Sequence, residues 1–224
     1  MSGPIPRLRA VTEPEDLRHT RDAYDDVAEL YAAMFANSLD DNPYDRAMLA
    51  VFAERVRAAG NGLVGDLGCG PGRITPHLDA LGLNVFGMDL SPEMIRLARA
   101  AHPALRFEEG SMERLPLADG ELGGILAWYS LIHTPPERVP GILGEFGRVL
   151  ADGGPLLLGF QAADESHDIQ PYDHKVATAY RWSLRGMEEL LDAAGFRTHA
   201  RMLREPDETE RTQHGYLLAT RSAA

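Results

Sequence analysis

Short apolar runs alternate with amphipathic segments along most of this chain. The apolar runs predict strands, whereas apolar residues in the segments between them recur at the spacing of a helix. The predicted strands span residues 63–66, 84–88, 105–109, 122–127 and 156–161, with a final pair at 196–203 and 211–220. The predicted helices span residues 73–80, 92–101, 136–150 and 184–194. This alternation predicts an α/β fold with a parallel sheet covered by helices.

The N-terminal part of the chain shows the helical period without strands. Apolar side chains within residues 22–37 recur every three or four positions, and acidic residues occupy the other face. A second helix is predicted over residues 44–59. We therefore expect a helical arm or cap over residues 1–60 and an α/β domain over residues 61–224. In that domain, residues 162–179 are polar and have no clear period, which predicts a loop that covers the site as a lid.

A glycine-rich loop follows the first predicted strand. Asp66 is followed by glycines at every second position, Gly68, Gly70 and Gly72. Without a Cβ atom, these residues let the backbone bend sharply and approach a ligand closely. Asp89 ends the next predicted strand, where its carboxylate is placed to accept hydrogen bonds from ribose hydroxyls. The loop and this second acid together predict a site for a nucleoside cofactor.

The spacing of the glycines distinguishes two classes of cofactor. A dinucleotide fingerprint requires a third glycine where this chain has Arg73, which disfavours a pyrophosphate ligand. The acidic residue and the alternating glycines instead resemble the first motif of class I S-adenosylmethionine-dependent methyltransferases. The cofactor of that family has no phosphate and presents a cationic methionine end and a ribose, which carboxylates such as Asp66 and Asp89 suit. The resemblance implies a Rossmann-like, seven-stranded, mostly parallel sheet flanked by helices, with its last strand antiparallel.

Further segments continue the resemblance in the same order. Residues 89–94 resemble the family's D-x-S-x-x-M segment, and residues 110–116 resemble its G-D-A-x-x-L-P loop beside the adenine. Ser111 replaces the usual Asp of that loop, so a serine hydroxyl or a backbone carbonyl must serve there. Tyr24 lies in a segment that resembles the family's Y-D-x-V-A-x-x-Y arm, where it either contacts the cofactor or packs in the core. The residues that the resemblance implies for binding S-adenosyl-L-methionine and its product S-adenosyl-L-homocysteine are Tyr24, Asp66, Gly68, Gly70, Asp89, Leu90, Met94, Ser111, Met112, Trp128 and Tyr129.

Two histidines are candidate catalytic residues. The implied reaction is an in-line displacement in which an oxygen, nitrogen or carbon nucleophile attacks the methyl group, with a general base where the nucleophile must lose a proton. His133 follows the strand predicted over residues 122–127, and an ordinary histidine pKa near 6.5 suits a base at neutral pH. A histidine bonded to the backbone is the alternative interpretation. His174, in the polar segment, is the second candidate, with a solvated lid residue as its alternative.

Composition restricts the partners of the chain. The formal net charge of -12 over 224 residues disfavours nucleic acid and anionic membranes as partners. No apolar stretch approaches the roughly 20 residues of a membrane span, the N-terminus does not read as a secretory signal, and the single cysteine, Cys69, fits a reducing compartment. We therefore expect a cytoplasmic protein. The eight histidines are scattered without metal-binding spacing, so no metal site is expected.

Three functions remain open from the sequence. The first is methyl transfer from S-adenosylmethionine to a small molecule. Aromatic side chains favour a compact aromatic or amphipathic acceptor, and they are Tyr24, Trp128, Tyr129, Tyr172 and Trp182. The second is a nucleotide-dependent oxidoreductase on a similar sheet, against which Arg73 argues. The third is a regulatory protein that binds the cofactor without catalysis.

Overall fold

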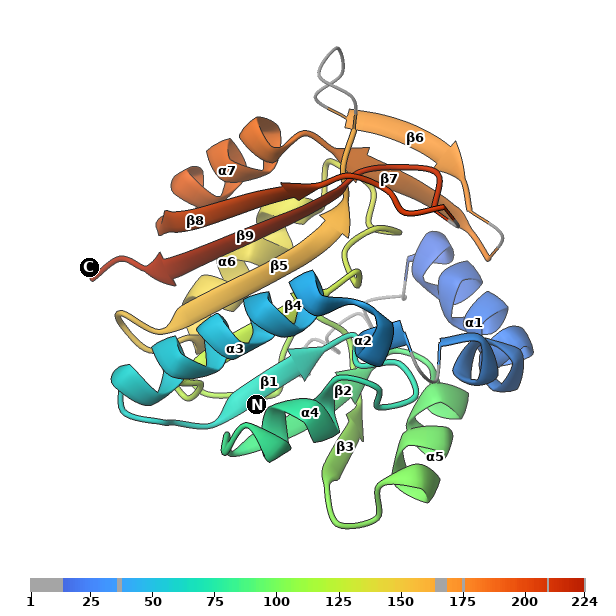
Figure 1. Cartoon of the computed structure of the whole chain (residues 1–224), viewed down its shortest axis with the longest axis horizontal. Coiled ribbons are helices and arrows are strands. Elements are labelled where there is room, and N and C mark those ends of the chain that lie inside the picture. The colour runs from blue at the N-terminus through green and yellow to red at the C-terminus, as the bar shows by residue number, and fades with distance from the viewer. Residues whose placement is uncertain (1–13, 36–37, 164–168, 175, 209, 224) are drawn as a thin grey trace, which may run out of the picture.

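A seven-stranded sheet forms the centre of the protein (Figure 1). The computed structural model describes residues 14–35, 38–163, 169–174, 176–208 and 210–223. The strands of the sheet lie in the order β3-β2-β1-β4-β5-β9-β8. Their bounds are β1 (Val64–Leu67), β2 (Val85–Asp89), β3 (Arg106–Glu109), β4 (Gly124–Trp128), β5 (Pro155–Gln161), β8 (Phe196–Arg204) and β9 (His214–Arg221).

The first five strands of the chain run parallel to one another. β1 pairs with β2 and β4, β2 pairs with β3, and β4 pairs with β5. β9, the last strand, lies between β5 and β8 and is antiparallel to both. The predicted mostly parallel sheet with an antiparallel last strand is therefore confirmed. The strand order reverses between β1 and β4, and in such sheets ligands bind outside the carboxyl ends of the strands at this point.

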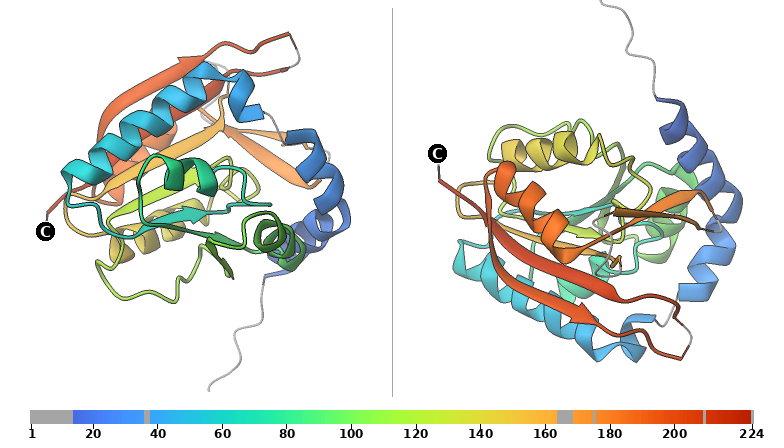
Figure 2. Two further views of the ribbon diagram at one scale, coloured as in Figure 1. Left: turned by 60° about the horizontal axis from the view of Figure 1, so that its bottom comes forward. Right: turned by 90° about the horizontal axis from the view of Figure 1, so that it is seen from above.

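Helices cover both faces of the sheet. α3 and α4 lie on one face and α6 and α7 on the other, as Figures 1 and 2 show, while α5 packs against β3. The helices are α1 (Glu15–Phe35), α2 (Ser38–Asp41), α3 (Pro43–Ala58), α4 (Thr75–Ala80), α5 (Pro92–Ala101), α6 (Val139–Val149) and α7 (Leu184–Ala193).

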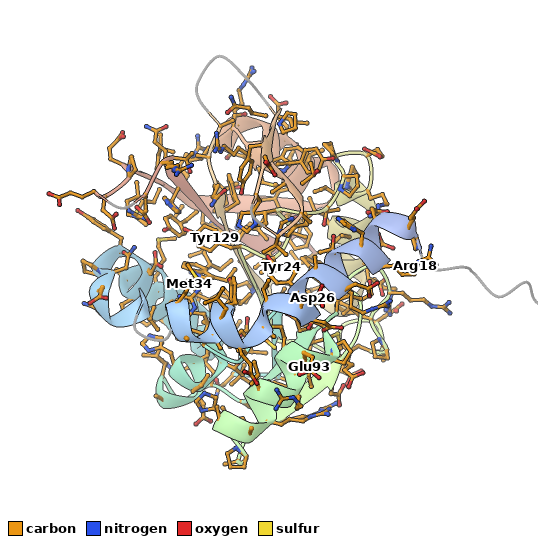
Figure 3. The ribbon with its side chains drawn as sticks, turned by 90° about the vertical axis from the view of Figure 1, so that its right-hand side faces the viewer. Arg18, Tyr24, Asp26, Met34, Glu93 and Tyr129 are labelled. Atoms are coloured by element: carbon orange, nitrogen blue, oxygen red, sulfur yellow. The ribbon has the colours of Figure 1, made fainter. Side chains whose placement is uncertain are left out.

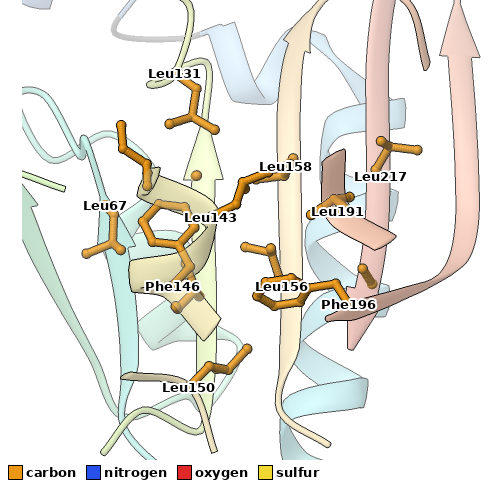
Figure 4. Packing of buried hydrophobic residues seen from close by; sticks show 14 of the residues in the cluster. Leu67, Leu131, Leu143, Phe146, Leu150, Leu156, Leu158, Leu191, Phe196 and Leu217 are labelled. Carbon is orange, nitrogen blue, oxygen red and sulfur yellow. The ribbon is translucent and has the colours of Figure 1, made fainter. Parts of the chain in front are cut away.

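The central strands contribute side chains to a core on each face of the sheet. Phe146 of α6 and Leu191 of α7 pack in one cluster with Leu156 of β5 (Figure 4). Phe52 of α3 packs in a second cluster with Leu157, the next residue of β5. Successive side chains of a strand point to opposite faces, so a strand covered on both sides reads as a continuous apolar run.

The two long N-terminal helices occupy different places. The Asn42 side chain caps α3 by accepting hydrogen bonds from the N–H groups of Tyr44 and Asp45, both at 3.1 Å, and Pro43 suits the first helical position. α3 then shares the core of the sheet. α1 lies instead at the carboxyl ends of the parallel strands and packs against α5 (Figure 2). The predicted arm therefore divides into a helix of the sheet layer and a helix beside the site.

The start of α1 was predicted too late. The helix begins at Glu15 rather than near residue 22. Its first turns are mainly charged and polar, so they carry no apolar stripe from which a helix is recognised. Acidic residues in the first turn, Glu15 and Asp16, are favourable beside the positive end of the helix dipole.

The segment predicted as a loop over residues 162–179 contains strands. β6 (Ile169–Asp173) and β7 (Thr178–Trp182) pair antiparallel in a separate two-stranded sheet. The side chains of β6 are exposed or half-buried throughout, so the strand lacks the apolar alternation that identifies a strand with one buried face. Residues 164–168 and 175 of this segment lie outside the described residues.

Candidate active site

A cavity lies at the carboxyl ends of the parallel strands, where the strand order reverses. α1 crosses this end of the molecule, as Figure 3 shows with Tyr24 labelled on it. The predicted site residues that line the cavity are Tyr24, Gly68, Gly70, Asp89, Leu90, Met94, Ser111, Met112, Trp128, Tyr129 and His133. Asp66 and His174 do not line it. Lining residues that were not predicted from the sequence include Thr20, Arg21, Ser130, Thr134 and Ile142.

The glycine loop closes around the end of β2. The N–H of Gly68 donates to the carbonyl oxygen of Met88 at 2.7 Å, and the N–H of Gly70 donates to Oδ2 of Asp89, also at 2.7 Å. Gly68 has a φ of 78°, and a Cβ at this position would lie 2.2 Å from Cβ of Ser130. Both the backbone conformation and the close approach therefore require glycine here.

The carboxylate of Asp89 joins the glycine loop to α5. Its Oδ1 accepts a hydrogen bond from the N–H of Ser91 at 2.9 Å, and Ser91 caps α5 by accepting from the N–H of Met94 at 3.0 Å. Burial raises the pKa of Asp89, while the backbone hydrogen bonds lower it. Each oxygen of a carboxylate can accept two hydrogen bonds, so Asp89 can still accept hydrogen bonds from a ligand in the cavity.

Asp66 lies beneath the loop and not in the cavity. Its Oδ2 accepts a hydrogen bond from the hydroxyl of Thr75 at 2.7 Å, and both residues are buried. Burial raises the pKa of Asp66 to about 6, although the hydrogen bond from Thr75 lowers it. The contact connects the end of β1 to the start of α4. Asp66 therefore supports the loop from below.

The loop after β3 lines another side of the cavity. The hydroxyl of Ser111 accepts a hydrogen bond from the N–H of Glu113 at 3.2 Å, which orders the turn that also carries Met112. A Cβ on Gly110 would lie 2.7 Å from Sδ of Met88, so this turn packs tightly on β2. Gly110 begins the segment that resembles the family's adenine loop but was not among the predicted site residues, although a glycine between a strand and a turn is typical of a close backbone approach.

Polar contacts hold α1 over the cavity. Oδ1 of Asp25 accepts a hydrogen bond from the hydroxyl of Ser91 at 2.5 Å. Near the start of α1, Asp16 forms an ion pair with Arg138, whose other N–H group donates to Glu113 at 2.6 Å. The sequence placed Asp25 only on the helix face opposite the apolar side chains, and the structure adds its contact with the cap of α5.

His133 connects Tyr24 to the β6–β7 hairpin. Its Nδ1 lies 2.9 Å from the carbonyl oxygen of Thr178, so Nδ1 carries the hydrogen of the neutral ring. Nε2 is then the acceptor, and the hydroxyl of Tyr24 donates to it at 2.9 Å. Burial lowers the pKa of His133 to about 4, which the Thr178 carbonyl opposes and the nearby His174 reinforces. The ring is therefore neutral at pH 7, with its basic nitrogen directed to Tyr24.

His174 lies behind His133. The two imidazole rings are 5.1 Å apart, edge to face, and the ring of Tyr172 lies 6.0 Å from that of His174. The structure thus brings together the two candidate catalytic histidines, but only His133 reaches the cavity.

Two polar atoms at the end of β4 have no hydrogen-bond partner among the described residues. They are Nε1 of Trp128 and Oγ of Ser130, both buried and both on residues that line the cavity. Buried polar groups in proteins are nearly always paired, so unpaired groups in a cavity indicate where a ligand supplies the partner. The signal available in the sequence was the position of these residues directly after an apolar strand.

Among the described residues, no group of three or more His, Cys, Asp and Glu side chains is arranged to hold a metal ion. Within the same residues, no helix has both the length and the apolar character needed to cross a membrane.

Comparison with known proteins agrees with this geometry. Residues 64–154, which contain the glycine loop and Asp89, match a family described as a methyltransferase domain. Malonyl-[acyl-carrier protein] O-methyltransferase of Erwinia billingiae is 36% identical over 112 residues, which are 48% of this chain and 44% of that protein. Demethylmenaquinone methyltransferase of Chlorobaculum parvum is 29% identical over 159 residues, which are 69% of this chain and 64% of that protein. The matches therefore span about half to two thirds of the length of these relatives.

A solved structure shares the fold over nearly the whole chain. It is 1,6-didemethyltoxoflavin-N1-methyltransferase of Burkholderia thailandensis with bound 1,6-didemethyltoxoflavin and S-adenosylhomocysteine, which has a TM-score of 0.72 and 20% identity and covers 97% of this chain and 94% of that chain. The fold and the glycine loop define a nucleoside-binding α/β protein. Residues 64–154 are thus similar to the methyltransferase domain family, and nearly the whole chain has the fold of a methyltransferase solved with S-adenosylhomocysteine.

Proposed function

We propose that this protein transfers a methyl group from S-adenosylmethionine to a small-molecule acceptor. The observation that carries the proposal is the glycine loop closed against Asp89 by a 2.7 Å hydrogen bond at the reversal of strand order. The unpaired polar atoms of Trp128 and Ser130 lie in the same cavity. A cradle without side chains, a carboxylate and unpaired donors suit a ligand with a ribose and an amino acid end.

Residues of the cavity would hold different parts of this cofactor. The carboxylate of Asp89 would accept hydrogen bonds from the ribose hydroxyls, and the turn with Ser111 and Met112 would flank the adenine. Trp128 and Ser130 would donate to the methionine carboxylate, since their buried polar atoms otherwise lack partners. The remaining predicted contacts come from residues that also line the cavity, namely Tyr24, Gly68, Gly70, Leu90, Met94 and Tyr129. Asp66 acts indirectly, through Thr75.

The chemistry is divided between cofactor and protein. When bound, S-adenosylmethionine supplies an electrophilic methyl group on a positively charged sulfur. The protein places the acceptor and excludes water, and α1 serves both tasks because it crosses the cavity and is held there by Asp25 and Asp16. Correct placement alone lowers the activation barrier by several kcal/mol in reactions between two bound partners.

We propose His133 as the general base, acting with Tyr24. The Thr178 carbonyl fixes the hydrogen on Nδ1, so Nε2 is free to take a proton. The acceptor would give its proton to the hydroxyl oxygen of Tyr24 while the proton of Tyr24 moves to Nε2 of His133. Because burial lowers the pKa of His133 to about 4, this base is weak and suits an acceptor with an acidic hydroxyl. His174 stays a prediction as a second base: its ring packs against that of His133, but it does not line the cavity.

The side chains that line the cavity indicate the chemical class of the acceptor. Tyr24, Trp128 and Tyr129 present aromatic surface there, and Leu17 and Ile142 add aliphatic surface, which favours a compact aromatic or amphipathic molecule. The similar proteins described above act, by their names, on different acceptors and do not decide between them. A cytoplasmic location stays a prediction from composition.

Calorimetric titration tests the cofactor. Wild-type protein should bind S-adenosylmethionine and S-adenosylhomocysteine but not NADH. Asp89→Asn should weaken both nucleosides about tenfold or more, because it removes a charge-assisted acceptor, whereas Asp79→Asn on the exposed end of α4 should bind like wild type. Binding of NADH alone would contradict the proposal and favour the oxidoreductase.

Turnover tests catalysis separately from binding. A panel of phenols, enols and amines is screened for release of S-adenosylhomocysteine, and His133→Gln is compared with wild type on the best acceptor. Loss of a general base should lower kcat about 10²- to 10⁴-fold while the affinity for S-adenosylhomocysteine is kept. Tight binding of the cofactor without turnover on any acceptor would favour the regulatory protein.

A further inference from the structure

A chain of four polar side chains runs from α3 to the cavity through the interior of the protein. Oδ1 of Asp45 lies 2.7 Å from the hydroxyl of Tyr216, which lies 2.9 Å from the hydroxyl of Tyr129, which lies 2.6 Å from Nδ1 of His214. Asp45, Tyr216 and His214 are buried, and Tyr129 lines the cavity. We call these four residues the Asp45–His214 chain.

The outer nitrogen of His214 is fixed by its neighbour. Nε2 of His214 lies 3.1 Å from Oε1 of Glu210. The two terminal nitrogens of Arg204 donate to the same carboxylate, at 2.7 Å to Oε2 and 2.6 Å to Oε1. An ionised carboxylate only accepts hydrogen bonds, so Nε2 of His214 must carry a hydrogen. In a neutral ring Nδ1 is then bare.

Counting hydrogens shows that the chain holds one more proton than ordinary ionisation gives. Each of its three close contacts needs one hydrogen, whereas the two phenols supply only two when Asp45 is ionised and His214 is neutral. The third hydrogen is either on Asp45, with every group donating toward His214, or on Nδ1 of His214, with every group donating toward Asp45. The two arrangements contain the same atoms and differ only in the position of three protons.

Burial favours the arrangement with the proton on Asp45. Burial raises the pKa of Asp45, and the charge of Glu210 adds to this rise. The hydrogen bond from Tyr216 and the charges of Arg204 and Arg73 oppose it. Burial also lowers the pKa of His214 to about 4. Arg204 adds to this lowering, whereas the carboxylates of Glu210 and Asp207 oppose it. Both shifts favour the arrangement in which Asp45 carries the shared proton and donates to Tyr216.

One member of the Asp45–His214 chain, Tyr129, has an unusual backbone conformation. Tyr129 has a φ of 56°, a left-handed conformation that is unfavourable for a residue with a side chain. Trp128 and Ser130, on either side of it, carry the buried polar atoms without partners in the cavity. The hydroxyl of Tyr129 (labelled in Figure 3) is held by two contacts within the chain, which oppose relaxation of this segment.

We propose that Asp45 is a positioning residue of the cofactor pocket, acting through a shared proton and Tyr129 to hold residues 128–130 in their binding conformation. The proposal rests on the proposed binding of S-adenosylmethionine. Without the proton, one contact of the chain becomes a contact between two lone pairs, and Tyr129 loses one of its two anchors. Asp45 itself does not line the cavity, so its effect must pass through the chain.

Substitutions at Asp45 separate the shared proton from the negative charge. Asp45→Asn places an N–H group where the proton is held, so all three contacts stay satisfied, whereas Asp45→Ala removes the end of the chain. Calorimetry with S-adenosylhomocysteine at pH 7 should give affinity within about threefold of wild type for Asp45→Asn and a loss of about tenfold or more for Asp45→Ala. Glu54→Gln, an exposed change on the same helix, is the control and should bind like wild type. Affinity of Asp45→Asn as weak as that of Asp45→Ala, or full affinity of Asp45→Ala, overturns the proposal.

An infrared difference spectrum tests the proton without the cofactor. Wild type minus Asp45→Asn at pH 7 should contain the carbonyl band of one protonated carboxylic acid. A spectrum without this band overturns the placement of the shared proton on Asp45. If wild type does not bind S-adenosylhomocysteine, the proposed function and the positioning role fail together. The infrared band decides independently of the cofactor whether Asp45 is protonated.

Discussion

Replacing His133 with glutamine should remove an acid sensitivity from the folded protein. Burial lowers the pKa of His133 in the folded state to about 4 from its ordinary 6.5. Between these values the unfolded chain binds a proton that the folded protein does not, so the free energy of unfolding falls as the pH falls from 6.5 to 4. Above 6.5 this cost is absent, and below 4 it is complete. At 1.36 kcal/mol per pKa unit, His133 alone should cost about 2 kcal/mol at pH 5.

Urea unfolding at pH 7.5 and pH 5 measures this cost. The stability lost between the two pH values should be smaller in His133→Gln than in wild type by about 2 kcal/mol. His19→Gln, a change at an exposed histidine of α1, should lose as much stability as wild type. His214, whose pKa burial also lowers to about 4, is present in all three proteins and cancels. Equal losses in wild type and His133→Gln would refute the inference that the ring is held neutral between Tyr24 and Thr178.

Three further substitutions test the site. Gly68→Ala and its control Gly82→Ala both place a side chain at a positive φ, which costs about 1 to 2 kcal/mol of stability. Only Gly68→Ala places a Cβ against Ser130, so calorimetry should show that only this variant loses S-adenosylhomocysteine binding. Thr75→Val leaves a buried carboxylate without its hydroxyl donor and should lower the free energy of urea unfolding by about 1 to 3 kcal/mol, while Thr75→Ser retains it. Arg138→Met removes the cation between α1 and the loop after β3, which should cost at most about 1 kcal/mol but speed amide exchange in the first turns of α1.

The part of the site that was predicted from the sequence is local. The glycine loop and Asp89 each follow an apolar run directly, and neighbouring parallel strands end at the same edge of the sheet. Once the runs are recognised as strands, the two must therefore meet, and the hydrogen bond from Gly70 to Asp89 confirms this meeting. The seven strands of the sheet and its antiparallel last strand followed from the resemblance to the family, whereas the order of the strands was not predicted.

The part that was not predicted depends on contacts between distant segments. Asp45 and Tyr216 are 171 positions apart, and Tyr24 and His133 are 109 positions apart. In the sequence Asp45 is one more polar residue in the first turn of a helix, with no period or motif to distinguish it. The β6–β7 hairpin was missed because the side chains of β6 are exposed or half-buried throughout and only Ala179 and Trp182 of β7 are buried. Neither strand therefore shows the apolar alternation of a strand with one buried face.

These two parts of the site have different consequences for function. The cofactor side is built from loops that directly follow β1, β2 and β3, where backbone geometry and a single carboxylate determine which ligand fits. The side proposed for the acceptor combines α1, the segment after β4 and the hairpin, which meet at Tyr24, His133 and Thr178. A substitution on α1 can therefore alter acceptor choice while the glycine loop and Asp89 stay unchanged. For this reason the sequence indicates the cofactor class well and the acceptor poorly, and fold similarity does not fill that gap.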